Sequence, residues 1–234
     1  MTTVETVSEA LRREILQGER PGGQRLVEQE LTARYGVARH TLRAALRQLA
    51  AEGLVRIEPN RGARVARLTA TDIVELYELR TALEVEAARL ALERHHGRMP
   101  TPVHDALSTL QDACEKRAWG AINEAHQHLH GAIVAAAGSP RIEAAHKALD
   151  GEMQLFMAQL EPLWSVERMA ADHVALVRGL ERDGPAVLRE HLAESAAALV
   201  AAEADRGRSG RVGDPTARQR GGGSALESGD LRSA

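Results

Sequence analysis

The spacing of apolar residues over roughly the first fifty positions predicts three helices. The first ends at Gly18, where the apolar pattern stops before a Pro-Gly-Gly turn. The second covers about 27–35, and Gly36 is well placed to end it in a left-handed conformation. The third covers 38–52, with an apolar stripe of Leu42, Ala45, Leu46 and Leu49. A helix, a tight glycine turn and a basic amphipathic helix are typical of a helix-turn-helix.

Two short alternating runs follow the third helix. They read LVRIE and ARVARL, and the turn residues PNRG lie between them. Alternation of apolar and polar positions on both sides of a glycine-containing turn predicts a β-hairpin. We therefore expect residues 1–68 to form a small α+β unit, a winged helix-turn-helix in which this hairpin is the wing.

From Thr69 onward the strand pattern disappears and the apolar spacing is helical. Helices are expected at about 70–95, 101–117, 119–137, 140–159, 165–182 and 185–204. Thr69 and Asp72 have the spacing of a capping pair for the first of these helices. The predicted fold class is therefore mainly α, with an all-α antiparallel bundle over 69–205 after the winged helix-turn-helix. Residues 206–234 have few apolar side chains and clustered glycines, and we expect them to form a disordered tail.

Charge is distributed unevenly over these segments. Residues 1–68 carry 12 basic and 8 acidic side chains, whereas residues 69–205 carry 12 basic and 22 acidic ones. The formal net charge of the whole chain is -3, so the positive charge of the first segment is hidden in the total. A basic N-terminal segment suits binding to a polyphosphate, and the sequence pI of about 6.4 does not argue against DNA binding.

Composition excludes several other classes of protein. No apolar run approaches the roughly 20 residues that a membrane helix needs. Charged residues stand where a signal peptide would have its apolar stretch. The single cysteine, Cys114, excludes an internal disulfide and is assigned no role. We expect a cytoplasmic protein without membrane attachment.

The first segment resembles the DNA-binding module of the GntR family. The resemblance extends from GERPGGQRL to RGARV. The matching residues are Gly18, Pro21, Gly22, Leu26, Glu28, Leu31, Gly36, Val37, Arg39, Arg43, Ala45, Leu46, Leu49, Gly53, Leu54 and Gly62. The chain departs from the family pattern at Thr32, Ala38 and Ala44, and Ala38 lacks the hydroxyl that the family usually has there. The resemblance implies a DNA-binding transcriptional regulator.

The second segment resembles the all-helical FCD domain, found in fatty-acid-responsive and sugar-acid-responsive members of that family. The supporting stretches are TATDIVELYELRTALEVEAARLA, HQHLHGAIVAAAGSPRI and DHVALVRGLERDGPAVLREHL. His126 stands where the family usually has Asp, and Leu129 where it has Phe. The interval from His173 to His191 is about one helical turn shorter than the family pattern. The resemblance implies a domain that binds a small effector.

The third helix is the expected reading helix. Its contacts with base edges and phosphates are assigned to Arg39, His40, Thr41 and Arg43. Arg39 and Arg43 lie on one helical face, and arginine bound through both nitrogens to guanine is the commonest specific base contact. Contacts with the DNA backbone or minor groove are assigned to Gln29, Arg34, Asn60, Arg61 and Gly62. The alternative is that these side chains only solvate the surface.

Histidines in the second segment form a candidate metal site. His126 and His130 are four residues apart, so both imidazoles project from one face of a helix. The resemblance places these two, with His173 and His191, where FCD domains often hold a divalent ion. Imidazole suits Zn²⁺ and Ni²⁺. The shortened interval leaves open whether His191 is a ligand, and the alternative for all four is that they are partly buried helix residues.

Arg80 is the candidate effector-binding residue. A guanidinium binds a carboxylate bidentately, so Arg80 suits a small organic acid, which we expect also to ligate the metal ion. A structural salt bridge to Glu84 is an equal alternative. Trp119 and Trp164 lie near helix breaks and are expected to pack, and His128 is expected at the surface.

These assignments predict a transcriptional repressor and not an enzyme. We expect a homodimer that binds a palindromic double-stranded DNA operator and responds to a small organic acid. One alternative is a metal-dependent hydrolase, but the chain has no H-E-x-x-H motif, phosphate loop or nucleophile elbow. Another is a ligand-blind architectural DNA-binding protein, which would have a solid helical core in place of a histidine-lined cavity.

Overall fold

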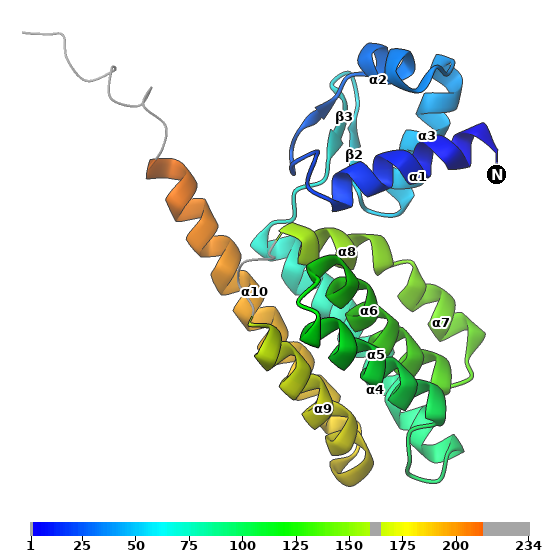
Figure 1. Cartoon of the computed structure of the whole chain (residues 1–234), viewed down its shortest axis with the longest axis vertical. Coiled ribbons are helices and arrows are strands. Elements are labelled where there is room, and N and C mark those ends of the chain that lie inside the picture. Colours follow the sequence, from blue (N-terminus) through cyan, green and yellow to red (C-terminus); the bar gives the residue numbers. More distant parts are fainter. Residues whose placement is uncertain (1, 160–164, 213–234) are drawn as a thin grey trace, which may run out of the picture.

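Two hydrophobic cores divide the chain into a small N-terminal unit and a larger helical bundle. The computed structural model describes residues 2–159 and 165–212. Fully buried leucines such as Leu42 and Leu49 lie in the N-terminal core. The bundle has a core of its own, which includes Ile122. Figure 1 shows the N-terminal unit above the bundle.

The N-terminal unit is a winged helix-turn-helix. Its elements are α1 (Thr3–Leu16), β1 (Arg25–Leu26), α2 (Glu28–Tyr35), α3 (Arg39–Ala51), β2 (Val55–Glu58) and β3 (Gly62–Val65). The three strands form an antiparallel sheet in the order β1-β3-β2. The predicted hairpin is present as β2 and β3. The sequence pattern did not predict β1, because two residues are too few to show an alternation.

Capping residues fix where these helices begin and end. Thr2 and Glu5 form a reciprocal capping box at the start of α1. Gly36 ends α2 with a φ of 64°, and its amide donates to the carbonyl of Thr32. A side chain with a Cβ is strained in this left-handed conformation. The predicted termination of α2 by glycine is therefore confirmed.

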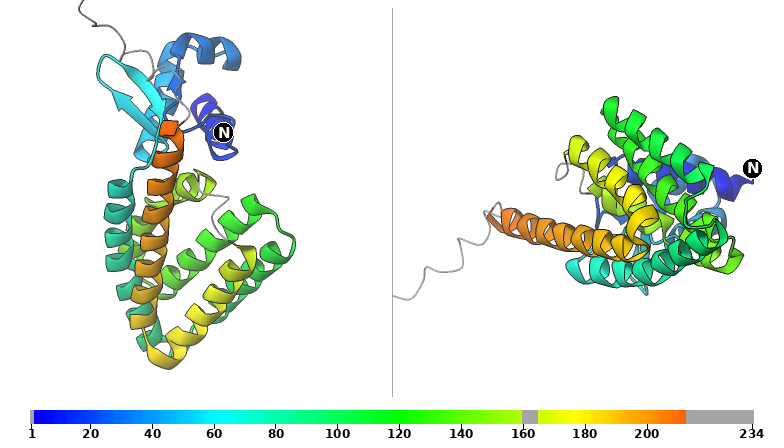
Figure 2. Two further views of the ribbon diagram at one scale, coloured as in Figure 1. Left: turned by 90° about the vertical axis from the view of Figure 1, so that its left-hand side faces the viewer. Right: turned by 90° about the horizontal axis from the view of Figure 1, so that it is seen from below.

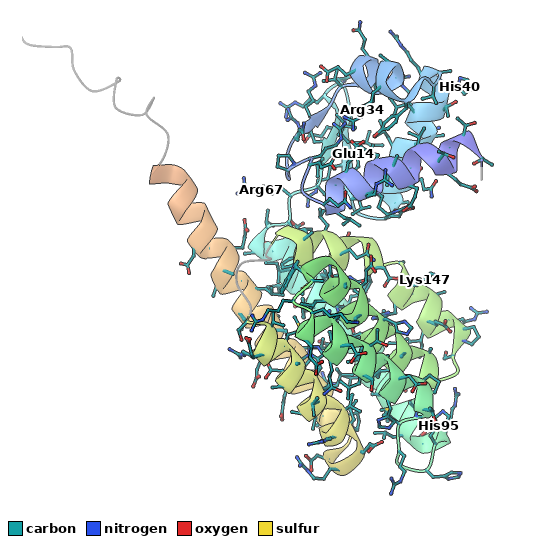
Figure 3. The ribbon with its side chains drawn as sticks, in the orientation of Figure 1. Glu14, Arg34, His40, Arg67, His95 and Lys147 are labelled. Carbon is teal, nitrogen blue, oxygen red and sulfur yellow. The ribbon has the colours of Figure 1, made fainter. Side chains whose placement is uncertain are left out.

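Glu14 ties α1 to the turn that follows it and to α2. Its carboxylate accepts hydrogen bonds from Arg20 Nε at 2.6 Å, Arg34 Nη2 at 2.8 Å and the Tyr35 hydroxyl at 2.9 Å. Glu14 and Arg34 are labelled close together in Figure 3. Burial opposes ionisation of Glu14, but these partners outweigh it and hold the pKa of the carboxyl below its ordinary value of 4.5. Burial and the Glu14 carboxylate raise the pKa of Tyr35 to about 12.

We expect Glu14→Gln to lower the free energy of unfolding near neutral pH by about 1.5–3 kcal/mol, because hydrogen bonds to a charged group are lost. A carboxyl whose pKa is lowered by folding stabilises the fold above its unfolded pKa and loses that contribution as pH falls through the folded pKa. The difference between the two proteins should therefore shrink below pH 4.5. Urea unfolding over a pH series measures it, with Glu9→Gln on the exposed face of α1 as the control. A difference that does not change with pH would contradict this role.

The bundle has seven helices in the described part of the chain. They are α4 (Ala70–Arg94), α5 (Thr101–Glu115), α6 (Trp119–Ala136), α7 (Pro140–Lys147), α8 (Asp150–Gln159), α9 (Val166–Asp183) and α10 (Ala186–Val212). Thr69 and Asp72 form the predicted capping pair at the start of α4. The long helices α4 and α10 lie side by side, and α6 contacts both α4 and α5 (Figure 2). The predicted fold class is confirmed.

The prediction of a single helix over 140–159 is wrong. α7 ends at Lys147 and α8 begins at Asp150. Between them the amide of Leu149 donates to the carbonyl of His146 at 2.9 Å, a three-residue turn that interrupts the four-residue helical pattern. Neither residue between the two helices is glycine or proline, but the Asp-Gly dipeptide at 150–151, directly after the break, is a common turn signal. The break allows α8 to lie at the end of the bundle that faces the N-terminal unit (Figure 1).

The last helix, α10, continues to Val212, beyond the predicted end of the bundle at 205. The chain has no proline between Pro185 and Pro215, so no strong helix breaker stops α10 earlier. The predicted tail is therefore helical where it begins. Its remaining part, residues 213–234, and Trp164 lie outside the described residues.

Helix α8 contacts both cores. Leu155 is fully buried in the N-terminal core, whereas the neighbouring Met153 and Phe156 belong to the bundle core. The backbones also approach closely, because a Cβ on Gly151 would lie 2.1 Å from the carbonyl oxygen of Glu52, which caps the end of α3. Only glycine fits at that position without a shift of the chain. Helix α8 therefore packs directly against the end of α3, the helix expected to read DNA.

Candidate DNA-binding surface and buried histidine site

The outer face of α3 presents the predicted reading residues. Arg39, His40 and Arg43 are exposed, and Thr41 is half-buried. His40 lies at the far side of the N-terminal unit from the bundle (Figure 3). On the opposite face Leu42 is fully buried, which fixes the rotation of the helix about its axis. A helix anchored in this way offers a continuous polar face to a DNA major groove.

Ion pairs hold some of the predicted DNA-contacting side chains in the free protein. Arg43 Nε donates to Glu28 Oε1 at 2.9 Å, so α2 orients this guanidinium. Arg34 is held by the Glu14 carboxylate. Gln29 is exposed on α2, and Arg39 forms no salt bridge with any residue that the structure describes. The DNA contacts assigned to these residues stay predictions.

The tip of the wing is shaped by residues in the left-handed conformation. Asn60 has a φ of 61° and Gly62 a φ of 84°. Asparagine and glycine adopt this conformation at less cost than other residues. The amide of Arg61 donates to the carbonyl of Glu58 at 3.1 Å and closes the turn. Asn60 and Arg61 therefore lie in the exposed turn between β2 and β3, and Gly62 is the exposed first residue of β3.

Three of the four predicted metal-binding histidines lie together inside the bundle. His126 and His130 on α6 and His173 on α9 each offer one ring nitrogen, and these nitrogens lie within 4.8 Å of one another. All three side chains are buried. Nδ1 of His126, Nε2 of His130 and Nε2 of His173 have no hydrogen-bond partner among the described residues. Buried polar atoms without a partner are costly and uncommon, so this group has the character of a cation site.

His191 on α10 lies beside this group. Its ring centroid is 4.8 Å from that of His173 and 5.7 Å from that of His130. The group of three converging nitrogens does not include a nitrogen of His191. His191 is therefore a neighbouring fourth imidazole, and whether it ligates an ion stays open.

Burial keeps these imidazoles neutral. It lowers the pKa of His173 to about 3 and that of His191 to about 2, and the neighbouring histidines add to the effect. Burial also holds the pKa of His126 well below its usual value. A neutral imidazole has the free lone pair that a metal ion requires. The donor set therefore fits a divalent ion such as Zn²⁺ or Ni²⁺.

Glu84 on α4 orients the imidazole of His130 through a hydrogen bond with its Nδ1. Its Oε2 accepts a hydrogen bond from His130 Nδ1 at 2.7 Å, so the other ring nitrogen, Nε2, is the one without a partner. Its Oε1 accepts from Arg80 Nε at 2.7 Å and lies 3.2 Å from His146 Nε2. Burial opposes ionisation of Glu84, but Arg80 and the histidines hold its pKa well below the usual range. A carboxylate in this position fixes the tautomer and orientation of a ligating imidazole.

Sequence reasoning missed two buried polar residues on the helices that surround this site. His146 pairs with Glu84 from α7, and no spacing in the sequence connects these two helices. Asn123 lies one turn before His126 on α6; its Oδ1 is buried without a partner, and its Nδ2 donates to the carbonyl of Gln154 at 3.3 Å. The spacing of Asn123, His126 and His130 along one helical face was the available signal.

Arg80 is enclosed by the bundle. Its guanidinium lies over the ring of Tyr77, with Cζ 4.7 Å from the centroid, and Nη1 is 3.6 Å from the sulfur of Met153. The salt bridge to Glu84, the structural alternative, is present. Binding of an effector carboxylate by Arg80 stays a prediction.

Comparison with known protein families identifies the family to which this chain belongs. The family model of bacterial regulatory proteins of the gntR family matches residues 3–65, and the FCD domain model matches residues 75–198. The chain belongs to the GntR family. The resemblance to GntR regulators with an FCD domain is confirmed. This GntR protein is a transcriptional regulator and not an enzyme, as predicted, because its family and relatives are transcription regulators.

Two curated relatives are transcriptional repressors by name, and one of them matches most of this GntR regulator. The probable D-xylose utilization operon transcriptional repressor of Paenarthrobacter nicotinovorans is 29% identical over 203 residues, which cover 87% of this chain and 89% of the relative. The HTH-type transcriptional repressor GlaR of Escherichia coli is 33% identical over 136 residues, or 55% and 60% of the two chains.

Solved structures agree with the fold. A GntR transcriptional regulator from Rhodococcus sp. RHA1 has a TM-score of 0.69 at 26% identity, covering 86% of this chain and 99% of that one. McbR/YncC of E. coli has a TM-score of 0.66 at 20% identity, covering 85% and 97%, and supports the fold alone. In the part of the chain that the structure describes, every helix is too short or too polar to cross a membrane.

Proposed function

We propose that this GntR regulator is a cytoplasmic repressor that binds a palindromic operator as a homodimer and changes its operator affinity when a small organic acid occupies the histidine site. Two relatives carry the word repressor in their names, which supports repression. A two-fold operator calls for two copies of the reading helix. The proposed effector response rests on one observation, the group of three buried histidines that each have a ring nitrogen without a hydrogen-bond partner.

His126, His130 and His173 would hold a divalent ion, with His191 beside them. When bound, the ion would supply positive charge and an open coordination position for a carboxylate oxygen. His126 stands where the family usually has Asp, so this donor set has no negative charge of its own. A neutral donor set leaves the ion its full charge, which favours an anionic effector over a neutral one.

The same histidines weigh against a ligand-blind DNA-binding protein. A core with no ligand to bind is normally apolar or has its polar atoms hydrogen-bonded. Here Asn123 Oδ1 adds a further buried acceptor without a partner on the histidine face of α6. These atoms support a site that recognises a polar ligand.

Helix α8 supports a link from this site to DNA binding. On the bundle side, Met153 contacts Arg80, and the carbonyl of Gln154 accepts the Asn123 amide. On the other side, Leu155 fills the N-terminal core. Consecutive residues of one short helix therefore contact the polar groups of the effector domain and the core beneath the reading helix. We propose that a shift of α8 transmits effector binding to the winged unit.

We expect the full-length protein, prepared without a metal-affinity tag, to take up about one Zn²⁺ per chain. His130→Ala should lower the affinity for Zn²⁺ by at least about tenfold. Substitution of a residue that only supports a metal ligand already costs about tenfold, and His130 would be a ligand itself. His128→Ala is the matched control, since His128 is exposed on the same helix. Calorimetric titration and elemental analysis measure both quantities.

Two results would overturn the metal site. One is the absence of Zn²⁺ uptake by the unsubstituted protein, and the other is equal uptake by the His130 and His128 variants. Either result would return these histidines to helix packing. The same three proteins then test the effector response, through operator affinity measured with and without small carboxylic acids.

A further inference from the structure

Three arginines form a row across the sheet of the winged unit. Arg64 on β3 pairs directly with Arg25 on β1 and with Arg56 on β2. Residues directly opposite each other in antiparallel strands project from the same face, with Cβ atoms about 5 Å apart. Like charges in this arrangement repel and destabilise the sheet. Negative charge from outside the row is therefore needed to offset this repulsion.

The described residues supply that negative charge at one end of the row. Arg56 Nη2 forms a salt bridge with Asp72 at 2.7 Å. Arg64 Nη1 donates to the carbonyl of Gly23 at 3.2 Å, which orients the guanidinium without neutralising it. Arg25 is exposed and forms no salt bridge with any described residue. The end of the row at Arg25 and Arg64 is thus left with excess positive charge.

An open pocket lies at this end of the row. It has a volume of about 380 Å³ and is lined by Arg25, Glu58, Asn60, Arg61 and Arg64. Three of these side chains are cationic and one is anionic, so the pocket has a net positive charge. Asn60 and Arg61 belong to the tip of the wing, which makes the pocket continuous with the DNA contact proposed there.

We infer that this pocket binds a phosphate of the DNA backbone beside the groove that the wing tip enters. The planar guanidinium matches the oxygens of a phosphate, and two of them from adjacent strands can hold one phosphate from two sides. Such a contact fixes the position of the protein on the duplex without reading its sequence. It adds Arg25 and Arg64 to the DNA-binding residues, and it depends on neither the metal nor the effector.

Binding of the full-length protein to a duplex of arbitrary sequence, measured at several salt concentrations, tests this site. The double variant Arg25→Gln, Arg64→Gln should reduce the slope of log K against log salt by about 0.9, the value for one phosphate. At about 0.1 M salt this change corresponds to roughly an eight-fold loss of affinity. The melting temperature should change little, because relief of repulsion within the row offsets the loss of the Arg64 hydrogen bond to the Gly23 carbonyl. Glu58→Gln should strengthen binding, because it removes the carboxylate from the pocket.

The double variant Arg178→Gln, Arg182→Gln is the matched control. It removes the same charge from two exposed positions on α9, and the slope should stay unchanged. Equal losses in the two double variants would assign the effect to net charge and overturn the site. An unchanged slope in the wing variant would overturn it as well, as would a loss of binding that accompanies a lower melting temperature. Inorganic phosphate that binds the pocket while the DNA slope is unaffected would identify a small-anion site instead.

Discussion

Arg39→Ala is expected to weaken operator binding by about 1–3 kcal/mol, or roughly 5- to 160-fold, if the side chain makes a bidentate base contact. Arg39 is exposed on α3 and forms no salt bridge with the described residues, so its substitution leaves no buried charge behind. The same loss is expected for Arg43→Ala, which also frees Glu28. Fluorescence anisotropy with an operator selected from random duplexes measures both affinities.

The ratio of specific to non-specific affinity separates base reading from phosphate contact. Arg39→Ala should lower this ratio, because non-specific binding depends on phosphate contacts. Arg61→Ala in the wing should weaken binding to the operator and to an arbitrary duplex alike, and Arg89→Ala on α4 should change neither. An Arg39 variant that keeps the full ratio would show that α3 does not read bases through this residue.

Gly151→Ala is expected to lower the free energy of unfolding by about 1–3 kcal/mol, the usual cost of overpacking. The added Cβ would lie 2.1 Å from the carbonyl oxygen of Glu52. The opposing atom belongs to the backbone, so no side-chain rotation relieves the clash and α8 has to move away from α3. Urea unfolding measures the loss, and hydrogen exchange should become faster at the end of α3 and in α8.

The control for this substitution is Gly120→Ala on α6. A Cβ there meets no heavy atom within 4 Å. Because alanine favours a helix over glycine by up to about 1 kcal/mol, this variant should be as stable as the unsubstituted protein or more stable. If the two variants were equally stable, the contact between α8 and α3 would not be close in solution.

The features that could be predicted from the sequence are local. Leu42 and Leu49 mark the buried stripe of α3 by their helical spacing, and Gly36 marks the end of α2. His126 and His130 share a face because they are four residues apart on one helix. For each of these, the physical reason lies within about two helical turns, so a single sequence contains it.

The features that could not be predicted depend on contacts between distant elements. The Asp-Gly dipeptide at 150–151 is a local turn signal, but the placement of α8 against both hydrophobic cores depends on residues far away in the chain. Glu84 contacts His130 and His146 only once three helices are assembled. The strand register that brings Arg25 beside Arg64 is likewise set by the folded sheet.

The burial of Leu155 also bears on how such regulators can be recombined. A chimera joined at residue 68 would keep the winged unit whole in sequence, yet it would exchange the leucine that fills part of its core. It would also exchange Gly151, whose backbone lies close to the C-terminal end of α3. Biosensors assembled from the two halves of different relatives should therefore carry α8 together with the DNA-binding unit, or have the two facing surfaces redesigned as a pair.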